Sequence, residues 1–236
     1  MIDFYYSPTP NGWKVAIMLA ETGLEHRTVL MNLRAGDQLT PAFRAISPNA
    51  KMPAIVDHDT PDGPQTVFES GAILLYLAER TGQFGPQTPT ERIAFNEWLF
   101  WQAANQGPMG GQLSHFVNYS PKGETYSHNR YKGEFERALA VMETWLDGQD
   151  YMLGRYSIVD MMCFPWAFIA KPLGVSLDNF PNVAAWRQRI KTRPAVIDAI
   201  NLHKDAQFSG KATAEQNATL FNQSAAHLMQ GQEKTN

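Results

Sequence analysis

The chain has 236 residues, a formal net charge of −3 at pH 7 and a single cysteine. This length suits one large or two modest domains that bury a core without disulfides or metals. The near-neutral charge argues against binding to nucleic acid or to an anionic membrane. No apolar run approaches the ~20 residues of a membrane span, and we expect no signal peptide at the amino terminus. With one cysteine, these features favour a reducing cytoplasm.

The first 81 residues alternate short apolar strands with amphipathic helices. The expected order is strand 2–6, helix 13–22, strand 26–31, helix 41–46, a β-hairpin whose turn spans 57–64, and helix 69–80. Strands on both sides of a crossover helix imply a partly parallel sheet covered by helices. This is the order of a thioredoxin-like α/β domain.

The rest of the chain predicts helices alone. Residues 82–90 are rich in Gly and Pro and are interpreted as a linker to an all-α C-terminal domain over 91–207. Helices are expected at 90–105, 126–146, 158–173, 183–192 and 195–203, with a break at 106–111. The polar residues 208–236 predict a disordered tail or a marginal helix near 218–229.

Ser157 and Asp160 have the spacing of a capping box at the start of the apolar helix 158–173. The buried N–H groups of such a helix end need partners, so we interpret this pair as a folding signal.

Residues 7–12, Ser-Pro-Thr-Pro-Asn-Gly, lie at the mouth of the first helix. Free N–H groups, the positive end of the helix dipole and the Thr9 hydroxyl can converge there on one anion. Thr9 and Asn11 are also good N-cap residues, so plain capping is the alternative.

A second group of candidates surrounds the hairpin. Pro53 heads the first hairpin strand, where a missing N–H is tolerable. A cis Met52–Pro53 bond would turn the Met52 backbone outward toward an extended guest, and the sequence leaves the isomer open. Glu69 and Ser70 then open a helix and create another anion-binding end.

Several of these stretches together resemble the cytosolic glutathione transferases. The matching segments are 7–15, 46–58, 68–79, 98–102 and 107–109, within a resemblance that runs from residue 1 to about 200. They are most similar to the Nu class, the bacterial glutathione-dependent disulfide-bond oxidoreductases, and to the related fungal nitrogen-regulation prion protein. The resemblance implies the glutathione transferase fold, a cytoplasmic homodimer, and glutathione as co-substrate.

The resemblance also implies roles for individual residues. Thr9 and Asn11 would face the glutathione sulfur as catalytic residues, and Glu69 and Ser70 would hold the γ-glutamyl group. The other implied glutathione-binding residues are Gln38 at the glycyl end, Lys51, Met52 through its backbone, Pro53, and Arg130 from the second domain. Tyr5, Tyr6, Ser7 and Lys14 are weaker candidates, and Tyr6 would suit a tyrosine-type transferase or a core position equally well.

The expected mechanism uses the thiol of the ligand. Cys163 lies in an apolar helix and is expected to be buried and inert. Oriented donors and a helix N-terminus could lower a thiol pKa of ~8.5 by about a unit, which would favour thiol–disulfide exchange. The alternatives are a conjugating transferase and a glutathione-transferase-like regulator without activity. The histidines have no metal-ligand spacing, so no metal is expected.

Overall fold

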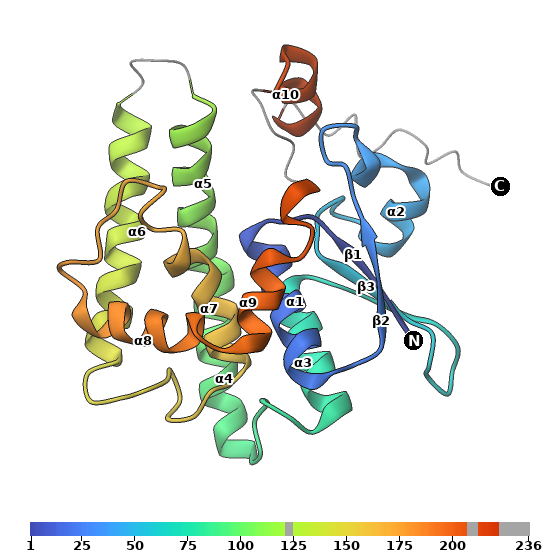
Figure 1. Cartoon of the computed structure of the whole chain (residues 1–236), viewed down its shortest axis with the longest axis horizontal. Coiled ribbons are helices and arrows are strands. Elements are labelled where there is room, and N and C mark those ends of the chain that lie inside the picture. Colours follow the sequence, from blue (N-terminus) through green and yellow to red (C-terminus); the bar gives the residue numbers. More distant parts are fainter. Residues whose placement is uncertain (121–124, 207–211, 222–236) are drawn as a thin grey trace. The chain divides into compact units, whose positions relative to one another are not determined.

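The computed structural model describes residues 1–120, 125–206 and 212–221 (Figure 1). The chain forms two compact units, one of Met1–Tyr76 with the described residues after Ala199, and one of Leu77–Ala199. The first unit contains a sheet and helices, and the second is helical, as predicted. None of the described helices is long and apolar enough to span a membrane.

The α/β unit follows the predicted order. Its elements are β1 (Ile2–Tyr6), α1 (Pro10–Thr22), β2 (His26–Leu30), η1 (Asp37–Leu39), α2 (Pro41–Ile46), β3 (Ala54–Asp57), β4 (Gln65–Phe68) and α3 (Ser70–Thr81). The strands form one sheet in the order β2-β1-β3-β4, with β1 parallel to β2 and antiparallel to β3. Figure 1 shows α1 and α3 on one face of this sheet and α2 on the other.

Apolar residues on both faces of the sheet explain its covering by helices. Phe4 and Tyr6 are fully buried, as are Val15 and Met18 of α1. Burying such side chains contributes roughly 1.5–3 kcal/mol each. On the other face Phe43 of α2 packs in a cluster with Met31, Ala54 and their partly buried neighbours.

Asp3 on β1 is a buried acid that ties two other strands to the sheet. Its carboxylate accepts two hydrogen bonds from Arg27, at 2.9 and 2.8 Å, and its Oδ2 lies 3.0 Å from Nε2 of His58. Burial raises the pKa of Asp3, but the hydrogen bonds from Arg27 and His58 outweigh burial and lower that pKa below its ordinary value.

The helical unit contains α4 (Pro89–Trp101), η2 (Gln102–Gln106), α5 (Gly107–Asn118), α6 (Tyr126–Trp145), α7 (Ile158–Phe168), α8 (Pro181–Lys191) and α9 (Pro194–Asn201). The predicted break at 106–111 is wrong, because the chain passes from α4 through one π-helical turn straight into α5. Pro108 falls in the first turn of α5, where a missing N–H does no harm. An added Cβ at Gly110 would lie 2.6 Å from the Trp166 ring, so this glycine serves close packing.

The predicted capping box is present at the start of α7. Ser157 Oγ accepts from Val159 N at 3.2 Å, and Asp160 Oδ2 accepts from Ser157 N at 3.0 Å. Asp160 Oδ1 accepts from Met152 N at 2.9 Å and from Trp186 Nε1 at 2.8 Å. Burial raises the pKa of Asp160 to about 6, although all these donors favour the ionised form. The box therefore anchors three segments of the helical core.

The described residues after α9 belong to the α/β unit and contain η3 (Lys204–Ala206) and α10 (Ala214–Phe221). The helix predicted near 218–229 overlaps α10 at residues 218–221, and its remainder lies outside the described residues, as do 208–211. The predicted domain limits of 1–81, 82–90, 91–207 and 208–236 stay predictions.

Candidate functional site

The sheet register brings three of the predicted stretches to one edge. Tyr5 near the end of β1 pairs with Ala54 at the start of β3, and Ala54 also pairs with Phe68 at the end of β4. The segments that continue from these residues, 7–11, 51–53 and 69–70, therefore leave the sheet at the same end. Residues from three distant parts of the sequence gather there.

Thr9 is the N-cap of α1. Its backbone is extended, with φ −129° and ψ 159°, and its Oγ1 accepts from Gly12 N at 3.2 Å. A threonine hydroxyl has one proton besides its acceptor lone pairs. Capping therefore uses only an acceptor position of Thr9 and orients the hydroxyl at the helix end, so capping and ligand binding are compatible.

The loop before α1 is tight, and this explains Gly12. Thr9 N donates to Ser7 O at 2.7 Å, and an added Cβ at residue 12 would collide with the same carbonyl oxygen. Asn11 is half-buried at the second position of α1. The helix predicted from residue 13 begins at Pro10, because proline suits the first helical position after a cap.

Met52 and Pro53 are joined by a cis peptide bond, which settles the isomer that the sequence left open. The Met52 side chain packs on the cluster of Met31, Phe43 and Ala54. Across the described ranges, neither the N–H nor the C=O of Met52 has a hydrogen-bond partner. This backbone can therefore pair with an extended peptide in the manner of an added strand. Lys51 beside it is exposed.

Glu69 stands immediately before α3, which begins at Ser70. Its φ of 68° lies in the left-handed region, which is uncommon for a residue other than glycine. Such a conformation costs about 1–2 kcal/mol, and strained residues of this kind cluster at functional sites. The strain places an exposed carboxylate beside the amino end of α3.

Ser70 is buried at the start of α3 and contacts a lysine that sequence reasoning ranked only as a weak candidate. Lys14 is 2% exposed, and its Nζ donates to Ser70 Oγ at 3.4 Å. A buried ammonium near the positive end of a helix makes this place electropositive. The signal in the sequence was a lysine on an otherwise apolar helix face.

Gln38 is placed differently from a ligand-facing residue. It is 3% exposed in η1, and its Nε2 donates to Leu33 O at 3.2 Å. Its Oε1 is buried and has no hydrogen-bond partner among the described residues. The glycyl-end role of Gln38 stays a prediction.

Arg130 lies on α6 in the helical unit, where its Nη1 bonds Glu134 Oε1 at 2.6 Å. This is an exposed ion pair one helical turn apart, which is worth little for stability. The role of Arg130 toward a ligand stays a prediction.

Tyr6 is a core residue. Its side chain is fully buried, and its hydroxyl donates to Leu202 O at 3.2 Å. Burial strongly raises the pKa of the Tyr6 phenol. Tyr6 is therefore held as a neutral donor to the segment after α9, which argues against a tyrosine-type catalyst.

The protein thiol lies away from the surface as well. Cys163 is fully buried on α7. Among the described residues, no group of three or more His, Cys, Asp or Glu could hold a metal ion.

Comparison with known proteins agrees with this geometry. The glutathione S-transferase N-terminal domain family matches residues 9–80, and the C-terminal domain family matches 111–194. The disulfide-bond oxidoreductase YfcG of Escherichia coli is 44% identical over 203 residues, which cover 85% of this chain and 94% of that protein. Protein URE2 of Eremothecium gossypii is 30% identical over 84% of this chain and 66% of its own length.

Solved structures give the same result. A glutathione transferase of Burkholderia graminis, with two glutathione molecules bound per subunit, has a TM-score of 0.82 and 42% identity over 86% of this chain and 88% of its own. A Pseudomonas putida glutathione transferase, with one glutathione disulfide bound per subunit, has a TM-score of 0.80 and 36% identity over 86% of this chain and 91% of its own. The chain therefore belongs to the glutathione transferase family.

Proposed function

We propose that this protein is a glutathione-dependent disulfide reductase that uses the thiolate of bound glutathione. The observation that carries the proposal is the edge where Thr9, the Met52 backbone and the Glu69–Ser70 pair leave one sheet together. It offers a donor for sulfur, a strand-like backbone for a peptide and a polar end for an amino acid. The relatives named as disulfide-bond oxidoreductases support the same reaction.

The γ-glutamyl group of glutathione carries an ammonium and a carboxylate, and the α3 end matches both. The Glu69 carboxylate would accept from the ammonium, and its strained backbone holds it outside the helix. Ser70, the nearby Lys14 charge and the amino end of α3 would attract the carboxylate.

The chain's own thiol is unsuited to the chemistry, because the single cysteine is fully buried. In the proposed reaction the glutathione thiol loses its proton to water, and the Thr9 hydroxyl and the α1 dipole stabilise the thiolate. The thiolate attacks one sulfur of the substrate disulfide, so a mixed disulfide forms and the other sulfur leaves as a thiolate that takes up a proton. A second glutathione attacks the glutathione sulfur of the mixed disulfide, giving glutathione disulfide and the second reduced thiol.

The test compares two assays on the same preparation: reduction of 2-hydroxyethyl disulfide by glutathione, and conjugation of glutathione to an aryl halide. Rapid reduction with slow conjugation is the expected result. The reverse ratio would establish the conjugating transferase instead. Glutathione binding without either activity would establish the regulator, which is the role suggested by the resemblance to the fungal prion protein.

We also propose a cytoplasmic homodimer. Ile93 and Phe100 are 62% and 72% exposed and lie two turns apart on one face of α4. Exposed apolar side chains on one helix face favour burial against a partner, and a second copy of the chain is the partner that the family implies. Sedimentation of the wild type and of Phe100→Asp tests this, since a wild-type monomer would refute the dimer.

A further inference from the structure

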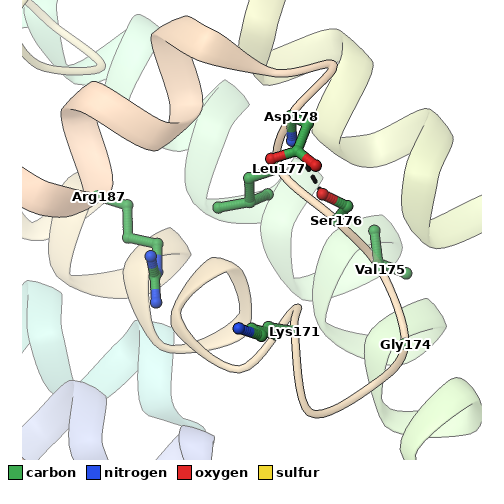
Figure 2. Close-up of a pocket in the computed structure, with 7 residues that line it drawn as sticks. All are labelled: Lys171, Gly174, Val175, Ser176, Leu177, Asp178 and Arg187. Atoms are coloured by element: carbon green, nitrogen blue, oxygen red, sulfur yellow. Dashed lines mark hydrogen bonds between the residues drawn. The ribbon is translucent and has the colours of Figure 1, made fainter.

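A cavity of about 400 Å³ lies in the helical unit, between the turn after α7 and the side of α8. Figure 2 shows the residues that line it: Lys171, Gly174, Val175, Ser176, Leu177, Asp178 and Arg187. None of them is among the residues proposed to bind glutathione. The volume falls within the roughly 300–1,000 Å³ of small-molecule sites.

Arg187 on α8 is held in place without a carboxylate. Its Nη2 donates to Phe168 O at 3.4 Å, and its guanidinium carbon lies 5.5 Å from the centre of the Phe168 ring. Its Nε is buried and has no hydrogen-bond partner among the described residues. Burial also lowers the pKa of Arg187, because water no longer fully stabilises the charge. The guanidinium is a fixed cation with a donor to spare.

Lys171 adds a second cation from the turn after α7. Figure 2 shows the Lys171 and Arg187 side chains extending toward the same space from different elements. Ser176 Oγ accepts from Asp178 N at 3.1 Å, which leaves the serine proton available as a donor. Asp178 is the one acid among the lining residues and lies exposed on that loop.

Other arginines of the helical unit differ from Arg187 in having carboxylate partners. Arg189, two residues further along α8, bonds Asp150 Oδ1 at 2.6 Å, and Arg155 bonds Glu91 Oε2 at 2.9 Å. In the described part of the chain, neither Arg187 nor Lys171 forms an ion pair. A partly buried cation without a counter-charge is costly unless an anion completes it.

We propose that this cavity binds a small organic oxyanion, a carboxylate or a phosphate ester, between Arg187 and Lys171. The planar guanidinium would bind two oxygens of the anion, and the ammonium would supply the second charge. The site is separate from the proposed glutathione site, and it holds or fails independently of the proposed reaction.

The experiment measures thermal stability of the full chain with inorganic phosphate and with succinate, at one pH and at constant ionic strength set with chloride. Saturable stabilisation by either probe is expected, because a ligand that binds only the folded state raises its stability by mass action. Preference for phosphate identifies phosphate esters as the ligands, and preference for succinate identifies carboxylates.

Matched variants separate the site from general charge effects. Lys171→Gln and Arg187→Gln should each weaken binding by about tenfold or more, through the loss of a charge-assisted contact. Arg189→Gln removes the same charge from the same helix and should change the affinity by less than about twofold. Asp178→Asn should tighten binding, because it removes a repelling carboxylate, whereas a loss of packing would weaken it. Lys171 is exposed, so its variant is expected to fold if Arg187→Gln does not.

Two results would overturn the proposal. One is a stabilisation that rises with either anion without saturating, or no stabilisation at all. The other is equal weakening by Arg189→Gln and Lys171→Gln, which would show attraction to net charge alone.

Discussion

Replacing Thr9 by valine removes a hydroxyl and nearly preserves the shape of the side chain. The hydroxyl caps α1 through Gly12 N at 3.2 Å, at the long end of hydrogen-bond distances. Loss of an N-cap costs about 0.5–2 kcal/mol, and the long bond suggests the lower half of that range. If the same hydroxyl also donates to a thiolate, its loss costs a further ~1.5–3 kcal/mol of transition-state stabilisation. That loss corresponds to roughly a 10- to 150-fold fall in kcat/KM.

Three variants separate the two roles of Thr9. Thr9→Ser keeps the cap and the donor, so stability and activity should both stay close to wild type. Thr9→Asp keeps the cap acceptor, and its charge suits the helix end, so stability should be maintained. However, aspartate lacks a proton and repels a thiolate, so its activity should fall at least as far as that of Thr9→Val. Urea unfolding gives the stabilities, and turnover of 2-hydroxyethyl disulfide with glutathione gives the rates.

The pH dependence adds an independent measurement of the same hydroxyl. Ultraviolet absorbance of the bound thiolate reports the pKa of glutathione on each variant. Each pKa unit corresponds to ~1.4 kcal/mol of thiolate stabilisation, so Thr9→Val should raise this pKa by about one unit or more. A Thr9→Val protein that is less stable yet turns over at the wild-type rate would refute the catalytic role and leave Thr9 as a cap alone.

Four further outcomes are expected. Tyr6→Phe should retain disulfide reduction and lose ~1 kcal/mol of unfolding free energy, since only the bond to Leu202 O disappears; an inactive, folded Tyr6→Phe would contradict the core assignment. Glu69→Asn should gain up to about 1 kcal/mol of stability, because asparagine tolerates a left-handed φ, and should raise KM for glutathione; an unchanged KM would remove Glu69 from the site. Asp160→Asn should lose ~2–4 kcal/mol of unfolding free energy in urea, because its amide NH₂ cannot accept from buried donors; wild-type stability would mean that the box is dispensable. Asp3 has a lowered pKa, so its stabilisation should be present above the ordinary value of 3.8 and be lost as pH falls below it; Asp3→Asn should show a shallower acid loss, and an identical acid profile would contradict this.

The sequence predicts most elements of the fold because their signals are local. Helix 41–46 and strand 2–6 have the predicted bounds, and the capping box of Ser157 and Asp160 forms as expected. The missed helix α5 shows the limit of local signals. Its first residues, Gly107 and Pro108, read as a break, but their neighbours in space decide the conformation, since Gly110 packs against Trp166.

The candidate site was predictable to the extent that it depends on resemblance and capping. The sequence could not show that Lys14 reaches Ser70, because that contact spans two helices. It also gave no sign that the Gln38 side chain folds back onto Leu33 O. The core position of Tyr6 depends on a hydrogen bond to a carbonyl 196 residues away, which no local pattern encodes.

The π-helical turn at Gln102–Gln106 makes this part of the chain sensitive to length more than to composition. A π turn holds one residue more than an α turn, so it acts as an insertion inside one long helix. Deleting any one of its residues would let the chain close into regular α-helix and rotate everything after it by about 100°. Gly110 would then leave the Trp166 ring and Leu113 would leave the core, although not one of their side chains had been altered. Among homologues, gaps in an alignment should therefore avoid these five residues even where their identities vary.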